Sequence, residues 1–102
     1  MILYNITYNI DAASDTEWRQ WLKDYYLPGV MTTGCFNRYK VYRLLQTSER
    51  EGINYAVQFF SESLEDLNQF LEHYAPPLTA ALQEKFRHRH VAFMSVLQDT
   101  EM

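Results

Sequence analysis

Residues 18–28 read WRQWLKDYYLP, a stretch rich in aromatic side chains that ends at a proline. Large apolar side chains recur in it at i, i+3, i+4 and i+7, the spacing of one helix face: Trp18, Trp21, Leu22 and Tyr25. Ser14 and Glu17 have the spacing of a capping box, and Pro28 disfavours helical geometry in the residue before it. We therefore expect an amphipathic helix that begins after Ser14 and ends at Pro28 and Gly29.

The end of this helix is echoed later in the chain. Residues 24–28 and 72–76 share one order of side-chain types: an acid, a ring, a tyrosine, a small or apolar residue and a proline. The echo indicates two matching halves, in which Tyr26 and Tyr74 would take corresponding places. On helical spacing Tyr74 falls at the centre of its apolar face, so we interpret it as a core residue. Tyr26 falls at the edge of its own apolar face, which makes it a candidate for lining a cleft.

Alternating apolar and polar residues predict strands on both sides of this helix. Residues 2–10 alternate throughout, with apolar side chains on one face and mostly polar ones on the other. Residues 36–46 and 53–60 are expected to form a hairpin around a polar loop at 47–52. Residues 91–97 predict the last strand.

A second helix is expected between the last two strands. Ser63 is a suitable N-cap, and apolar residues recur at helical spacing up to Tyr74. Pro76 and Pro77 then interrupt the helix, and another helical piece follows. The order is βαββαβ, an α+β arrangement with both helices on one sheet face. Right-handed crossovers give a ferredoxin-like antiparallel sheet with the first and third strands in the middle.

The length of 102 residues predicts a single domain that spans residues 1–102. Aromatic residues make up 16% of the chain, more than one sheet face of so small a domain is expected to bury. Two helices cover one face only, and the other face would remain in water in a monomer. We therefore expect a homodimer in which two sheets face each other and form a dimeric α/β barrel.

Charge and composition restrict the partners. The net charge of −4 argues against nucleic acid or an anionic membrane as the main partner. The single cysteine, Cys35, excludes an internal disulfide framework and fits a reducing cytoplasm. The first eight residues alternate and lack a basic segment, so we expect no signal peptide, and no apolar run is long enough to span a membrane.

Several short pieces spread over nearly the whole chain carry a resemblance: Tyr4-Asn5-Ile6-Thr7, Trp18-x-x-Trp21, Pro28 followed by Thr33-Gly34-x-Phe36, Arg43-Leu44-Leu45, Gly52-x-x-Tyr55-Ala56-Val57-Gln58, Ala75-Pro76-x-Leu78 and Val91-Ala92-Phe93. Together they resemble an uncharacterised bacterial family, domain of unknown function 4286. The resemblance implies a ferredoxin-like subunit that pairs into a dimeric α/β barrel. It extends to the wider set of such barrels, which includes small cofactor-free monooxygenases, isomerases and decarboxylase-like proteins.

The chain departs from the expected family pattern at the helix ends. The family is expected to carry His-x-Pro there, where this chain has Tyr26-Leu27-Pro28 and Tyr74-Ala75-Pro76. An unperturbed phenol titrates near pH ~10, so it donates hydrogen bonds but is a poor base at neutral pH. The replacement makes an enzyme less expected without excluding one.

Polar residues on the first and third strands are candidate ligand contacts. If these strands are neighbours, Asn5, Thr7 and Gln58 would lie close together and could line a polar cavity on the helix-free sheet face. With Tyr26 they would orient a small apolar or aromatic molecule between sheet and helices. Asn9 belongs to the same polar face. The alternative is that these side chains form hydrogen bonds in a dimer interface or face water.

Other chemistries are less well supported. His88 and His90 would share a strand face, but no third ligand has a matching spacing, so we expect no metal and interpret residues 87–90 as a solvated basic cluster. Cys35 has no base at a recognisable spacing. The third strand lacks the basic residue and glycine of RNA-recognition domains, which share this element order.

Three functions remain open. The leading hypothesis is a cytoplasmic homodimer that binds a small molecule and needs no cofactor. The second is a cofactor-free enzyme of the monooxygenase or isomerase type, with Tyr26 as proton donor. The third is a structural or interaction module whose free sheet face pairs with itself or with another protein.

Overall fold

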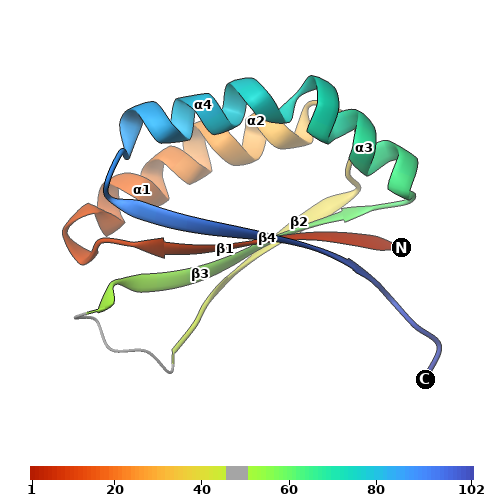
Figure 1. The fold of residues 1–102 in the computed structure, drawn as a ribbon, viewed down its shortest axis with the longest axis horizontal. Coiled ribbons are helices and arrows are strands. Elements are labelled where there is room, and N and C mark those ends of the chain that lie inside the picture. Colours follow the sequence, from red (N-terminus) through yellow and green to blue (C-terminus); the bar gives the residue numbers. More distant parts are fainter. Residues whose placement is uncertain (46–50) are drawn as a thin grey trace.

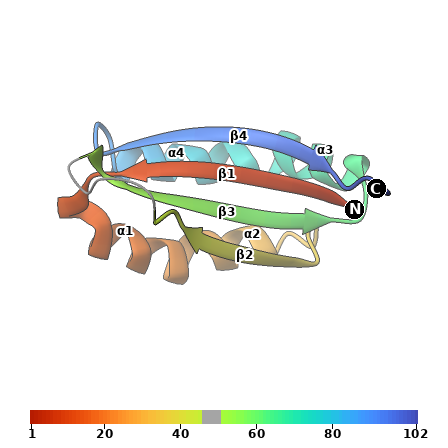
Figure 2. The same cartoon turned by 90° about the horizontal axis from the view of Figure 1, so that it is seen from below.

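The computed structural model describes residues 1–45 and 51–102. Its four strands follow the predicted order along the chain: β1 (Ile2–Ile10), β2 (Arg38–Arg43), β3 (Ile53–Ser61) and β4 (His90–Gln98). They form one sheet in the order β2-β3-β1-β4, in which all neighbours are antiparallel (Figure 2). The α+β ferredoxin-like fold is therefore confirmed, with the first and third strands at the centre of the sheet.

The alternation of side chains sets the two faces of the sheet. In β1 and β3 every second residue is buried, and the residues between them are half-buried. Tyr8 pairs with Tyr55 and Ile6 with Val57, so the buried sets of the two strands share one face. The structure ends β2 earlier than predicted, at Arg43, and the predicted loop at 47–52 falls largely outside the described residues.

The first helical layer continues past Pro28, and the predicted end there is wrong. It comprises a 3₁₀ turn, an α-helix, a π-helical segment and a second α-helix: η1 (Ala12–Ser14), α1 (Asp15–Trp21), η2 (Leu22–Tyr26) and α2 (Leu27–Met31). The Leu27 N–H bonds to the Leu22 carbonyl, five residues back. This wider turn lets Pro28 lie in the first turn of α2, where a missing N–H is tolerated.

The predicted capping box at Ser14 does not form. Ser14 precedes α1 but has helical backbone angles, φ −100° and ψ −1°, and its side chain makes no cap hydrogen bond. A capping side chain requires an extended residue, whereas Ser14 ends the 3₁₀ turn η1. Its buried hydroxyl instead accepts a hydrogen bond from Nη1 of Arg89 at 3.3 Å.

The second helical layer follows the prediction more closely. It consists of α3 (Leu64–His73) and α4 (Ala75–Lys85). Ser63 is the N-cap of α3, and its Oγ accepts a hydrogen bond from the Asp66 N–H at 3.2 Å. The two helices separate at Tyr74, and α4 begins with both prolines in its first turn. The predicted interruption is therefore confirmed.

All helices lie on one side of the sheet (Figure 1). The core between the sheet and the helices is largely aromatic. Trp18 contacts Tyr8 and Tyr55, with ring centroids 5.2 and 4.8 Å apart, and the rings of Phe36 and Phe70 are 5.0 Å apart. Within the described residues no helix covers the opposite face, and none is long and apolar enough to cross a membrane.

Candidate functional site

A partly enclosed chamber lies between the sheet and the helices, beside the edge strand β4. Its volume is about 220 Å³. Strands β1 and β4, the π-helical segment η2 and helix α4 supply its lining: Tyr4, Ile6, Tyr8, Tyr26, Thr79, Leu82, Gln83, His90, Ala92 and Met94. We call it the inner chamber.

The register of the sheet explains why these side chains meet. The buried face of β1 carries Tyr4, Ile6 and Tyr8. In β4 the residues paired with this face are His90 opposite Ile10, Ala92 opposite Tyr8 and Met94 opposite Ile6. Paired residues in neighbouring strands point to the same face, so half of β4 is directed at the helices.

Tyr26 enters the chamber from η2 and is held there by other rings. Its side chain is 5% exposed. Trp21 stacks on it with ring centroids 5.5 Å apart, and Phe59 meets it edge-on at 6.1 Å. Because a π-helical turn shifts the side chains that follow it around the helix axis, η2 also determines the direction in which Tyr26 points.

The phenols of the chamber are neutral hydrogen-bonding groups. Burial raises the pKa of Tyr4 and of Tyr8, and the negative charge that Tyr26 carries when it is ionised raises both further. Burial also raises the pKa of Tyr26, while the hydrogen bond with Tyr8 lowers it. A hydrogen bond therefore joins the Tyr8 and Tyr26 hydroxyls. One of the two hydroxyls donates this bond, and the proton of the other is left for another acceptor, which a ligand oxygen can supply.

His90 adds an imidazole to the chamber. Its Nδ1 lies 2.9 Å from the carbonyl oxygen of Phe86. A carbonyl only accepts, so Nδ1 carries the proton, and in the neutral ring Nε2 is then an acceptor. The sequence pattern predicted that His90 lies in a solvated basic cluster, and it did not predict this role. Its position opposite Ile10 in the strand register is the signal that points to the chamber.

The sequence-predicted ligand residues are not brought together. Tyr26 lines the inner chamber, whereas Asn5, Thr7 and Gln58 lie on the helix-free face of the sheet. There the Gln58 amide donates to the Asn5 oxygen at 3.3 Å, and the Asn5 amide donates to Thr7 Oγ at 3.2 Å. Strand alternation separates the two sets, so the four residues do not share one pocket within a subunit.

Two further predictions are wrong. Tyr74 is not a core residue, because it is 43% exposed at the break between α3 and α4. His88 does not share a strand face with His90, since it lies in the preceding turn with φ 63°. Cys35 is a half-buried free thiol. Among the described residues, no group of three metal-ligating side chains is close enough to hold an ion.

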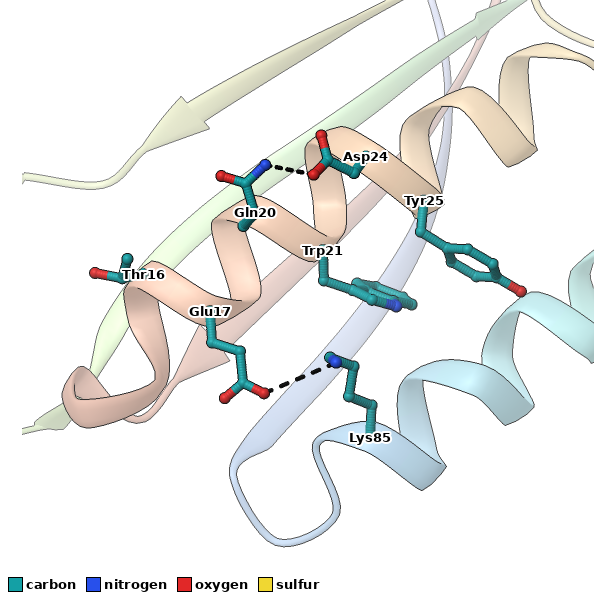
Figure 3. A pocket seen from close by; sticks show the side chains of 7 residues that line it. All are labelled: Thr16, Glu17, Gln20, Trp21, Asp24, Tyr25 and Lys85. Carbon is teal, nitrogen blue, oxygen red and sulfur yellow. Dashed lines mark hydrogen bonds and ion pairs between the residues drawn. The ribbon is translucent and has the colours of Figure 1, made fainter.

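A second hollow, between α1 and α4, is a weaker candidate. Figure 3 shows the Trp21 indole between the two helices and Glu17 of α1 directed at Lys85 of α4. Glu17 pairs with Lys85 within the hollow at 3.9 Å and with Arg89, which does not line it, at 3.3 Å. Gln20 donates to Asp24. The charged groups of this hollow are therefore already engaged.

Solved structures of similar fold place the chain among ferredoxin-like proteins. HapK from Hahella chejuensis is 12% identical with a TM-score of 0.72, over 100% of this chain and 95% of that one. A dimeric ferredoxin-like protein from an uncultured marine organism is 11% identical with a TM-score of 0.73, over 100% and 98%. SnoaB from Streptomyces nogalater, a cofactor-independent oxygenase, is 8% identical with a TM-score of 0.62, over 99% and 96%.

Sequence comparison identifies the family. No curated protein matches the chain. A family of uncharacterised proteins matches residues 1–100, nearly the whole length. The resemblance drawn from the sequence is thus confirmed, and the chain belongs to the family described as Domain of unknown function (DUF4286).

Proposed function

We propose that the protein binds a small apolar or aromatic molecule in the inner chamber. The observation that carries this proposal is the convergence of Tyr8, Tyr26 and His90 on a hollow whose remaining walls are mostly apolar. Pockets of this kind, apolar with a few placed polar groups, are the usual sites for small ligands. The Tyr26 hydroxyl would donate to a ligand oxygen, and His90 Nε2 would accept from a ligand hydroxyl.

Binding of 4-ethylphenol, measured by isothermal titration calorimetry, tests the proposal. We expect saturable binding that Tyr26→Phe weakens about tenfold, the loss of one hydrogen bond to a buried partner. Tyr74→Phe is the matched control, because Tyr74 precedes the same kind of X-Pro pair outside the chamber, and it should leave the affinity unchanged. Equal weakening by both variants would overturn the assignment.

We propose in addition that the subunit pairs through its helix-free sheet face. Apolar side chains are exposed there, led by Phe93 at 67%, next to the hydrogen-bonded Asn5, Thr7 and Gln58. Burying these apolar groups against a second copy would remove them from water and place the polar residues between two sheets. The similar ferredoxin-like protein that is described as dimeric supports the pairing of two subunits.

Sedimentation equilibrium tests the dimer. Phe93→Glu should produce a monomer, because it would place two charges in the interface. Leu64→Glu is the control, since Leu64 is similarly exposed but begins α3 on the helix side. A wild-type monomer at micromolar concentration would refute the pairing.

We also propose a cytoplasmic location, which the single free thiol of Cys35 supports.

A second candidate function is proton transfer without a cofactor. His90 favours it, because its Nδ1–H is engaged by the Phe86 carbonyl and its Nε2 is left as a base in the same chamber as the Tyr8 and Tyr26 phenols. The similar SnoaB is described as a cofactor-independent oxygenase, which fits this chemistry. Exchange of the α-hydrogens of 2-tetralone in D₂O should proceed above the buffer rate. It should fall at least tenfold in His90→Gln and stay unchanged in His88→Asn.

A further inference from the structure

We propose that the ligand of the inner chamber is an elongated amphiphile, with one polar head in the chamber and an apolar tail that leaves along α4 towards Pro76. The inference rests on the proposed function, because it assumes that a ligand occupies the chamber. It adds the shape and class of that ligand and a second set of contacts that determine specificity.

Another hollow, separate from the one between α1 and α4, adjoins the inner chamber on its outer side. Its volume is about 440 Å³, and it shares Tyr4, Thr79, Gln83 and Met94 with the inner chamber. We call it the outer groove. The inner chamber alone is smaller than most ligand pockets, which hold about 300–1,000 Å³. A ligand that fills only the chamber would be very small, whereas one that continues into the groove would have an ordinary size.

The lining of the outer groove suits a hydrocarbon. The four residues that it does not share with the chamber are Leu71, Ala75, Pro76 and Ala80, all apolar, and no charged side chain lines it. Beside it Met94 is 66% exposed on the helix-facing side of the edge strand. An exposed apolar strip of this kind gains free energy when a hydrocarbon covers it.

The junction between the two hollows can open. The Tyr4 hydroxyl donates to Sδ of Met94 at 2.8 Å, and both side chains line both hollows. A thioether is a weak acceptor on a flexible side chain, so a ligand tail would displace this contact easily. The junction is therefore adaptable, while Tyr8 and Tyr26 are held at the deep end by their shared hydrogen bond.

The geometry of α4 gives the direction and reach of the tail. Gln83 lines both hollows, and Pro76 lines the outer groove alone. The two residues are seven positions apart in α4, a distance of about 10 Å at 1.5 Å per residue. A medium-length alkyl chain or an extended flat ring system covers this distance. A head with one hydroxyl or carbonyl oxygen satisfies the Tyr26 donor.

Calorimetric titration with 4-ethylphenol, 4-butylphenol and 4-octylphenol, each below its aggregation concentration, tests the inference on the full chain. We expect affinity to rise with tail length, by up to about fourfold per methylene buried. Ala80→Trp should fill the outer groove and abolish this dependence while 4-ethylphenol still binds as in the wild type. Glu84→Trp is the control on the same helix, since Glu84 is exposed and lines neither hollow, and it should preserve the dependence.

The outcomes separate this inference from the proposed function. If all three phenols bind equally well, the groove holds no tail and the inference fails, while the chamber remains a binding site. If none of them binds, both fail. If Glu84→Trp removes the dependence as fully as Ala80→Trp does, the effect does not come from the groove, and the inference is overturned.

Discussion

Tyr26-Leu27-Pro28 and Tyr74-Ala75-Pro76 share a pattern, yet they have opposite environments in the fold. Tyr26 is 5% exposed inside a helical layer that continues to Met31. Tyr74 is 43% exposed at a point where the helical layer breaks. A local triplet that looks the same in both halves thus supplies a chamber wall in one and a surface side chain in the other.

The number of prolines explains part of the difference. Pro28 stands alone, and the π-helical turn before it keeps the backbone bonded through the Leu27 N–H. Pro76 and Pro77 remove two consecutive donors, and the chain meets this loss by starting a new helix. The break leaves Tyr74 with φ −118° between the two helices, outside the regular turn that would direct it at the core.

The first prediction concerns truncation and carries the largest effect. Tyr26→Ala should lower the free energy of unfolding by about 3–5 kcal/mol, because it opens a cavity among Trp21, Phe59 and Tyr8. Tyr74→Ala should change it by less than about 1 kcal/mol, since the side chain is largely solvated. Urea unfolding of both variants measures the difference. Similar losses in the two would show that the halves are equivalent after all.

The second prediction removes only the hydroxyl groups. Tyr26→Phe takes away the hydrogen-bond partner of the buried Tyr8 hydroxyl and should cost about 1–3 kcal/mol. Tyr74→Phe should stay within about 0.5 kcal/mol of the wild type. The double variant Tyr8→Phe/Tyr26→Phe should lose less free energy of unfolding than the two single variants lose together, because no unpaired donor then remains. Strict additivity would contradict the hydrogen bond.

The third prediction uses pH to examine the buried side of the comparison. Burial raises the pKa of Tyr4, Tyr8 and Tyr26 above the value of about 10 in the unfolded chain. Their contribution to stability is therefore complete below pH ~10 and is lost as the pH rises from there towards the folded-state values.

The free energy of unfolding, measured as the pH is raised from about 9, checks this. Each group should add a slope of about 1.4 kcal/mol per pH unit between its unfolded-state and folded-state pKa. Tyr26→Phe should remove the contribution of one group, about 1.4 kcal/mol per pH unit, from this slope. A wild-type stability that is constant through this range would mean that the phenols are not buried in solution.

The fourth prediction has the smallest effect and concerns the residue after Pro28. A Cβ added at Gly29 would lie 3.1 Å from Cδ2 of Leu78, the flexible end of a half-buried side chain. Alanine is favoured over glycine inside a helix by about 0.8–1.0 kcal/mol. If Leu78 shifts slightly, Gly29→Ala should raise the free energy of unfolding by less than about 1 kcal/mol. A lower Tm in thermal unfolding would show that the close approach of α2 and α4 is rigid.

The sequence predicts the architecture well because its signals are local and periodic. The alternation in residues 2–10 and 53–60 yields two central strands with the correct buried faces. Ser63 gives the start of α3, since its hydroxyl needs only the nearby Asp66 N–H. The same reasoning fails at Ser14, whose hydroxyl bonds to Arg89, 75 residues away.

The candidate site was harder to predict because its residues come from distant elements. Asn5, Thr7 and Gln58 do lie together, as neighbouring strands require, but on the face opposite to Tyr26. His90 was overlooked, since a run of basic residues resembles a solvated turn. Only its pairing with Ile10 shows that it faces the helices.

The sequence by itself determined the βαββαβ order, the buried face of each central strand and the position of the helix break, because each depends on periodicity or on proline within a few residues. The tertiary structure alone decided that the first helix passes Pro28, that Tyr26 rather than Tyr74 is buried, and that Tyr8, Tyr26 and His90 share a chamber. Those outcomes depend on a π-helical turn and on strand register. Both are selected by the packing of one layer on another, which no local pattern contains.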